Sequence, residues 1–445
     1  MNIIKSRLSL LSNYLRVHPL ELVLFFGILL RVVAFLFQGA FNNDDHLAYV
    51  QHIYQYHALP VSGQLHQSNH PPLYYFLASL LFSHGVKMVQ ALSLAFSIGT
   101  LTVMYFLIKK LEFIQPLALK QTCLLFVSSL PQFIMFGNYI SNDSLSFFIG
   151  ALIFLQIYRL LLKPTLLNQS ILAILLGLGL STKGMFLLFI PVLILLVIMI
   201  NLRSKTGLKK SIIFTVIFVA IFTGLGSYKG INNMMHFGRP IVIIDKDTEW
   251  IKYQSPTYAG FKSLYDVNVL KLVKYPVLSE HTQHAYLLML YASFWYQYLP
   301  ESDFKANLTG AKYLGSLIYI LALLPTFLFL AGFLKTASFI KKLFKLPGLI
   351  SINSGSTVYE VVCLLLLASN FLVFILLACK YDVYSAFQGR FLFPSLFSLV
   401  VLFNSGFRYL QKKLPGAQKV VFPLMICLDL LFILYFGIEI FRKVI

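Results

Sequence analysis

Long apolar segments constrain this chain more than any other feature. The first runs from about Pro19 to Phe37, and others follow at 86–108, 118–137, 143–162, 168–183, 185–202, 211–228, 313–334, 357–379, 391–409 and 419–441. A helix needs about 20 apolar residues to cross a bilayer, and only structures that pair their own backbone groups survive there. The sequence therefore predicts an all-α polytopic membrane protein with about eleven transmembrane helices.

Composition agrees with this fold class. The chain is 58% hydrophobic and only 12% charged, with a mean hydropathy of +0.78, whereas soluble domains carry about 25% charged residues. No cleavage signature follows the first apolar segment, and no repeat or low-complexity linker divides the rest. We expect residues 1–445 to form a single membrane-embedded domain. The cysteines lie scattered in apolar segments and are interpreted as small core residues: Cys123, Cys363, Cys379 and Cys427.

The positive charges predict the orientation. The chain has 36 Lys and Arg against 16 Asp and Glu, and the basic residues gather in alternate connections between apolar segments. Under the positive-inside rule, these connections and the N-terminus are cytoplasmic. Basic residues in cytoplasmic loops account for the net charge of +20, so we expect no nucleic-acid partner. The loops 39–85 and 138–142 contain no Lys or Arg and are predicted to face outward, and the segment 229–311 is long enough to cover the outer mouth as a lid. Arg442 and Lys443 fall outside the rule in this topology.

The first outward loop is the main candidate site. Between Gly39 and Phe76 it carries Asp44, Asp45 and half of the chain's ten histidines. Adjacent residues of a helix point about 100° apart, so the two acids should have different roles. If residues 43–57 are helical, Asp45 shares a face with Tyr49 and His52. A simpler alternative is that Asn42, Asn43, Asp44 or Asp45 caps this helix.

The histidines of this loop raise the question of a metal. A zinc site needs three or four convergent ligands. We instead interpret the five imidazoles of this loop as interfacial side chains: His46, His52, His57, His66 and His70. A divalent ion held by Asp44 or Asp45 stays an open alternative. Arg31, inside the first apolar segment, is predicted to face the bundle interior or to snorkel.

A second motif in the loop is His70-Pro71-Pro72-Leu73-Tyr74-Tyr75. Proline is tolerated in the first turn of a helix and restrains the residue before it, so this pair of prolines predicts a helix start. The aromatic side chains that follow are typical of a membrane interface.

Together these motifs resemble a known family. The pattern comprises the acidic pair, the Pro-Pro-Leu-Tyr element, Asn142-Asp143, Thr182-Lys183-Gly184, Phe294-Trp295 and Gln388-Gly389-Arg390-Phe391-Leu392-Phe393-Pro394. In this order it is similar to the GT-C superfamily of integral-membrane glycosyltransferases, in particular to protein O-mannosyltransferases and lipid A aminoarabinose transferases. The family's acidic pair is most often Asp-Glu, and no large soluble domain follows the last apolar segment here, which favours a bacterial inner-membrane protein.

The resemblance implies a function and roles for residues. Such enzymes move a sugar from a polyprenyl-phosphate carrier to an acceptor on the outer face, here with inversion, and work within the lipid bilayer. Asp44 matches the catalytic base, and Asp45 would orient it, bind the acceptor or hold a metal. Arg390 would clamp the donor phosphate, with Lys183 as a second candidate. The residues expected to bind substrate or support the site are His70, Tyr74, Asn142, Asp143, Gln388 and Trp295.

Each of these roles has a plainer alternative. Arg390 is also typical of an interfacial anchor and Lys183 of a snorkelling lysine, while Asn142 and Asp143 suit a helix start. For the whole chain, the rival function is a transporter or flippase for a lipid-linked or small polar substrate. The halves show no paired repeat, and the ionisable residues gather at the predicted outer face, which favours the enzyme. A non-catalytic subunit of an envelope complex is the third alternative.

Overall fold

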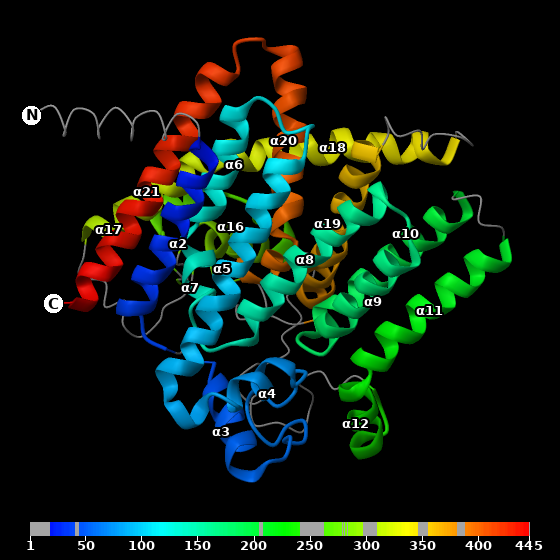
Figure 1. The fold of residues 1–445 in the computed structure, drawn as a ribbon. Coiled ribbons are helices and arrows are strands. Elements are labelled where there is room, and N and C mark those ends of the chain that lie inside the picture. The colour runs from blue at the N-terminus through cyan, green and yellow to red at the C-terminus, as the bar shows by residue number, and fades with distance from the viewer. Residues whose placement is uncertain are drawn as a thin grey trace, which may run out of the picture.

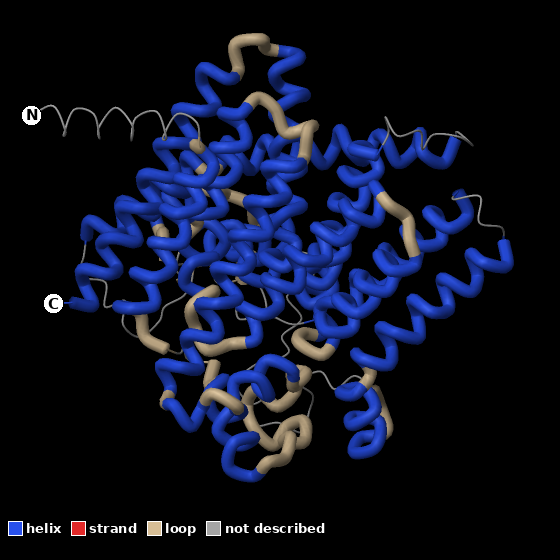
Figure 2. Tube along the Cα trace, viewed as in Figure 1, coloured by secondary structure: helices blue, strands red, loops and turns tan. Residues whose placement is uncertain are grey.

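The computed structural model describes residues 18–40, 44–203, 208–240, 262–277, 279, 281–282, 284–296, 309–345, 355–380 and 388–444. These residues form helices joined by loops, and no strand is drawn among them (Figures 1 and 2). The prediction of an all-α polytopic membrane protein is confirmed.

Nine helical segments within the described residues are long and apolar enough to cross a membrane. They comprise α2 (Pro19–Phe37), α5 (Val86–Lys110), α8 (Asn142–Leu162), η2 (Gly184–Leu188) with α10 (Phe189–Arg203), α11 (Leu208–Gly226), α17 (Thr309–Leu321) with α18 (Leu323–Lys345), α19 (Gly355–Lys380), η5 (Gly389–Ser395) with α20 (Leu396–Lys413), and α21 (Gln418–Val444). Two further predicted spans are shorter than expected: α6 (Leu117–Ser129) and α9 (Leu166–Leu180).

Pro131 explains why α6 is short. Proline has no N–H to continue a helix, so α6 ends before Leu130 and a short helix, α7 (Pro131–Phe136), begins after it. The carbonyl groups left at this break receive hydrogen bonds from Arg31, whose guanidinium reaches the oxygens of Val127 (3.5 Å) and Ser128 (3.2 Å). Arg31 is fully buried. Arg31 therefore faces the bundle interior and does not snorkel.

Small residues allow a close helix contact between α18 and α20. A Cβ atom on Gly332 would lie 1.9 Å from the carbonyl oxygen of Leu402, and one on Gly406 would lie 2.0 Å from that of Leu328. Real side chains cannot occupy those positions, so the two glycines let the backbones touch, as small residues do in membrane bundles. This contact fixes α20, which continues from η5.

One end of the bundle carries the short helices of the first loop. They are α3 (His46–Tyr56), α4 (Leu73–Ser79) and η1 (Phe82–His84), and α12 (Tyr228–Phe237) lies at the same end (Figure 1). As predicted from Pro71-Pro72, a helix begins at Leu73, whose N–H donates to the carbonyl of Ser181 (2.9 Å). That bond ties the loop to the end of α9.

The opposite end of the bundle carries basic residues. Lys120 donates to the carbonyl of Lys109 (2.7 Å), and the guanidinium of Arg408 lies 5.6 Å from the ring centre of Phe113. The basic residues that follow α5 and those at the end of α20 therefore lie close together, at the end of α5 away from α3 and α4 (Figure 1). Which end is cytoplasmic stays a prediction.

The predicted lid at 229–311 is described only in part. Residues 241–261 and 297–308 lie outside the described residues. The described part contains α12, α14 (Lys262–Tyr265), α15 (Leu270–Lys274) and α16 (Tyr286–Trp295). Of these, α16 is buried and contacts η5, so it belongs to the bundle rather than to a cover over it.

Candidate active site

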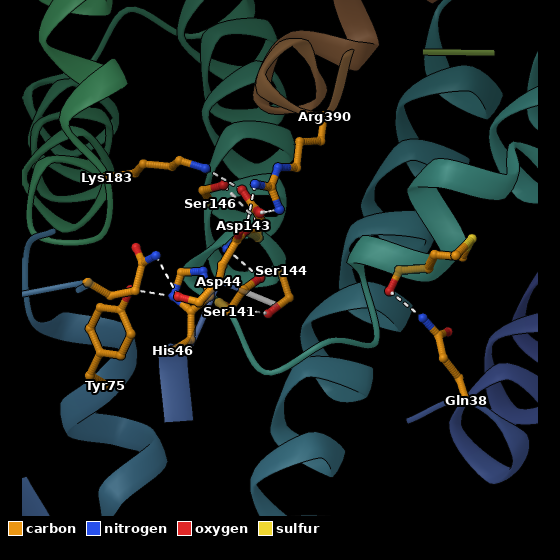
Figure 3. A network of polar contacts seen from close by, with 12 residues as sticks. Gln38, Asp44, His46, Tyr75, Ser141, Asp143, Ser144, Ser146, Lys183 and Arg390 are labelled. Carbon is orange, nitrogen blue, oxygen red and sulfur yellow. Dashed lines mark hydrogen bonds and ion pairs between the residues drawn. The ribbon is translucent and has the colours of Figure 1, made fainter. Parts of the chain in front are cut away.

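An ion pair joins the first loop to the far end of the sequence. The Nη2 atom of Arg390, in η5, lies 2.7 Å from Oδ2 of Asp44 (Figure 3). The Asp44 side chain is 32% exposed, whereas that of Arg390 is 7% exposed. The structure thus brings together the two residues that the sequence predicts as base and phosphate clamp.

A second carboxylate lies behind this pair. Asp143, in the first turn of α8, places Oδ2 3.5 Å from Nη1 of Arg390, and its Oδ1 forms a short ion pair with Lys183. Its side chain is only 3% exposed. Ser141 caps α8 by accepting a hydrogen bond from the N–H of Asp143 (3.2 Å). The Asp143 carboxylate therefore binds two cations instead of capping the helix.

Aromatic rings enclose the two cations. The Arg390 guanidinium lies 4.5 Å from the ring centre of Phe136 and 5.2 Å from that of Phe391, and Lys183 Nζ lies 4.7 Å from the same Phe391 ring. Cations over aromatic faces gain electrostatic stabilisation that grows when water is excluded. Lys183 is buried, so it does not snorkel to water, and Arg390 is not an exposed interfacial anchor.

Local backbone geometry sets the position of Arg390. The N–H of the preceding residue, Gly389, donates to Oγ of Ser293 (2.8 Å). A Cβ atom on Gly389 would lie 2.4 Å from the Cα atom of Phe294, so only glycine allows this close approach. Gln388, directly before it, is buried, and its Oε1 has no hydrogen-bond partner. Gly389 therefore allows the backbone before Arg390 to pack against α16.

The backbone around Asp44 separates the acidic pair. The carbonyl oxygen of Asp44 accepts hydrogen bonds from Nε2 of Gln67 (2.6 Å) and from His66 (3.1 Å). Asp45 adopts a left-handed conformation (φ 52°) and is exposed at the start of α3, without a side-chain capping bond. The helix begins at His46, so Asp44 takes part in the ion pairs while the Asp45 side chain is exposed. The alternative caps Asn42 and Asn43 lie outside the described residues.

His46 borders the charged cluster and is buried, whereas the sequence predicts an interfacial side chain. Its Nδ1 lies 2.7 Å from the hydroxyl of Tyr75, and its ring stacks on His70 (centroids 6.1 Å apart). Burial lowers the pKa of His46 to about 4, so the imidazole is neutral at neutral pH. The spacing of His46, Tyr49 and Ile53, which form the buried face of α3, could have indicated that this histidine points inward.

Comparison with known protein families gives one match. Residues 37–227 match the model of a family described as dolichyl-phosphate-mannose-protein mannosyltransferase. This part of the chain is therefore similar to that mannosyltransferase family, which supports the resemblance to GT-C proteins. No curated protein matches the chain. The matched region contains Asp44, Asp143 and Lys183, while Arg390 lies beyond it.

Three other residues that the sequence predicts in the site are buried. Asn142 donates to the carbonyl of Thr182 (3.1 Å), which fixes the backbone next to Lys183. The Tyr74 hydroxyl pairs with Oγ of Ser93 (2.7 Å), and the side chain is fully buried. Trp295 is buried too and stacks on the ring of Phe329 (centroids 6.1 Å apart) within the apolar core. Of these, Asn142 lies directly beside the cluster through its neighbour Asp143.

Metal ligands do not gather in the part of the chain that the structure describes. No group of three or more His, Cys, Asp or Glu side chains there could hold a metal ion. The cationic groups near Asp44 and Asp143 are instead Arg390 and Lys183.

Proposed function

We propose that this protein transfers a sugar from a polyprenyl-phosphate carrier to an acceptor hydroxyl at the outer face of a bacterial inner membrane, with inversion at the anomeric carbon. The family match supports a membrane glycosyltransferase that uses such a donor. One observation carries the proposal: Arg390 bridges a partly exposed carboxylate, Asp44, and a buried one, Asp143.

The two cations suit the donor phosphate. As the bond between the anomeric carbon and the phosphate oxygen breaks, negative charge grows on the phosphate and needs fixed positive charge nearby. Arg390 and Lys183 provide it, and Asp143 holds both of them in place. A phosphate can take over the guanidinium donors that now reach Asp44, because arginine binds carboxylate and phosphate through the same planar set of N–H groups.

Asp44 is the better candidate for the base. In the proposed step, the acceptor oxygen forms a bond to the anomeric carbon, the phosphate leaves with the bonding electrons, and the acceptor proton passes to a carboxylate. Asp44 is 32% exposed and can meet an acceptor, whereas Asp143 is 3% exposed and neutralises two buried cations. A single displacement of this kind inverts the anomeric centre. Asp45, exposed beside it, would contact the acceptor.

The test is sugar transfer by Asp44→Asn in a reconstituted assay with a polyprenyl-phosphate sugar. General base catalysis contributes about 10²- to 10⁴-fold, so turnover should fall by that factor while the protein stays folded. Asp266→Asn is the matched control, since Asp266 is also an ion-paired carboxylate, with 33% side-chain exposure, and should retain full turnover. Near wild-type turnover of Asp44→Asn would exclude Asp44 as the base.

A further inference from the structure

The helix α12 exposes its apolar side and buries its polar side. Tyr228, Ile231 and Met235 follow one another at helical spacing and are 46%, 56% and 78% exposed. Lys229 and Asn233 lie four residues apart on another face, and both are buried. A helix on a water-exposed protein surface shows the reverse arrangement.

The buried side of α12 holds the first loop. Nζ of Lys229 donates to the carbonyl of Ser68 (2.6 Å), and Oδ1 of Asn233 accepts a hydrogen bond from Oγ of Ser62 (2.7 Å). Both serines lie in the connection between α3 and α4. Gln67, directly before Ser68, donates to the carbonyl of Asp44. Two polar contacts therefore link α12 to the segment that positions Asp44.

α12 directly follows a candidate membrane span with exposed apolar side chains, α11. α12 follows α11 after the single residue Ser227, and the N–H of Ile231 donates to its carbonyl (2.9 Å). α11 is a candidate span of which 17% is buried, with exposed apolar side chains such as Val216 (59%) and Leu225 (43%). A helix that begins one residue after a span starts at the membrane boundary, where aromatic side chains such as Tyr228 are favoured.

We infer that α12 is an interfacial helix whose apolar face lies among the lipids of the leaflet at the α3 end of the bundle, and whose polar face anchors the Asp44 loop. The partner of this surface is bilayer lipid. Lys229 and Asn233 act as positioning residues, because they reach Asp44 only through the loop. The lipid contact rests on geometry alone. An effect of α12 on sugar transfer, through the position of Asp44, rests on the proposed function.

Fluorescence quenching tests the lipid contact without an activity assay. We would introduce tryptophan at Met235, on the apolar face, or at Gln64, which is exposed in the loop, and reconstitute each variant in phosphatidylcholine vesicles with brominated acyl chains. The added emission of Met235→Trp should be blue-shifted and quenched severalfold more by the brominated lipid than that of Gln64→Trp. Emission from Met235→Trp that is quenched by aqueous acrylamide as strongly as emission from Gln64→Trp would overturn the lipid contact.

Hydrogen exchange tests the anchoring of the loop. Lys229→Met removes the donor to Ser68 at nearly constant side-chain length, and amide exchange in peptides covering residues 58–70 should become about tenfold faster, as expected for the loss of one hydrogen bond. Lys210→Met is the control, because Lys210 is exposed at the other end of α11. Unchanged exchange in Lys229→Met would overturn the anchoring role, and neither outcome depends on whether the protein transfers sugar.

Discussion

Arg31 and Arg390 are both buried arginines of one helix bundle, yet their surroundings differ. Arg31 donates to the backbone oxygens of Val127 and Ser128, at the break between α6 and α7. Arg390 instead reaches two carboxylates, Asp44 and Asp143. The first guanidinium donates to carbonyl oxygens at the break before Pro131. The second lies in a cluster whose carboxylate Asp44 is partly exposed.

This difference separates a structural charge from a functional one. A guanidinium that pairs with backbone carbonyls inside the bundle has no partner that a ligand could replace without unfolding the helix end. A guanidinium that pairs with the half-buried carboxylate of Asp44 can exchange that partner for a phosphate. We therefore expect Arg31 to determine stability and Arg390 to determine donor binding.

The largest expected effect is on the stability of Arg31→Met. Loss of the guanidinium leaves two buried carbonyls without donors, at about 1 to 3 kcal/mol each, so the free energy of unfolding should fall by roughly 2 to 6 kcal/mol. Denaturant titration of the detergent-solubilised protein measures this. Arg159→Met is the control, since Arg159 is exposed in the last turn of α8. Equal stability of the Arg31 and Arg159 variants would contradict the structural role of Arg31.

Arg390→Lys tests the functional side of the comparison. Lysine keeps the charge but cannot bridge Asp44, Asp143 and a phosphate with a planar set of donors. Sugar transfer should fall by about 10²-fold, mainly through weaker donor binding, with little change in stability. Full activity would show that charge alone suffices there. A loss of stability as large as that of Arg31→Met would make Arg390 a structural residue as well.

The pH dependence of stability sharpens the comparison at the α3 end of the bundle. Burial holds the pKa of His46 at about 4 in the folded state, against 6.5 when exposed. Because the unfolded chain binds the proton first, this histidine lowers stability as pH falls from 6.5 towards 4, by about 2 kcal/mol at pH 5.

His46→Gln should flatten the fall in stability between pH 6.5 and pH 4, as measured by denaturant titration at several pH values. Burial lowers the pKa of His70 too, so part of the slope should remain. An unchanged slope in His46→Gln would show that folding does not lower the pKa of this imidazole.

The sequence predicted the spans well because hydropathy is a local property. It also indicated the helix start at Leu73 from the prolines before it. The break between α6 and α7 was missed, although Pro131 within the predicted span 118–137 was a visible signal. The left-handed backbone at Asp45 was not predictable, since it depends on the contacts that hold the loop.

The site was predicted as a set of residues but not as an arrangement. Arg390 and Asp44 stand 346 residues apart, and their contact arises from the packing of η5 against α8 and α16. In the sequence, only the resemblance to GT-C proteins indicates that Arg390 and Asp44 belong to one site. No local sequence pattern predicts the pairing of Asp143 with both cations. The pair with Lys183 forms because the end of α9 packs beside the start of α8.

Mass spectrometry of lipids that co-purify in mild detergent tests the central claim most directly, with wild type, Asp44→Asn and Arg390→Met compared. We predict that wild type and Asp44→Asn retain a polyprenyl-phosphate sugar and that Arg390→Met loses it, since the arginine holds the phosphate and the aspartate only takes the proton. Equal retention by all three proteins would contradict the phosphate role of Arg390, and finding only bulk phospholipid in all three would contradict the donor site itself.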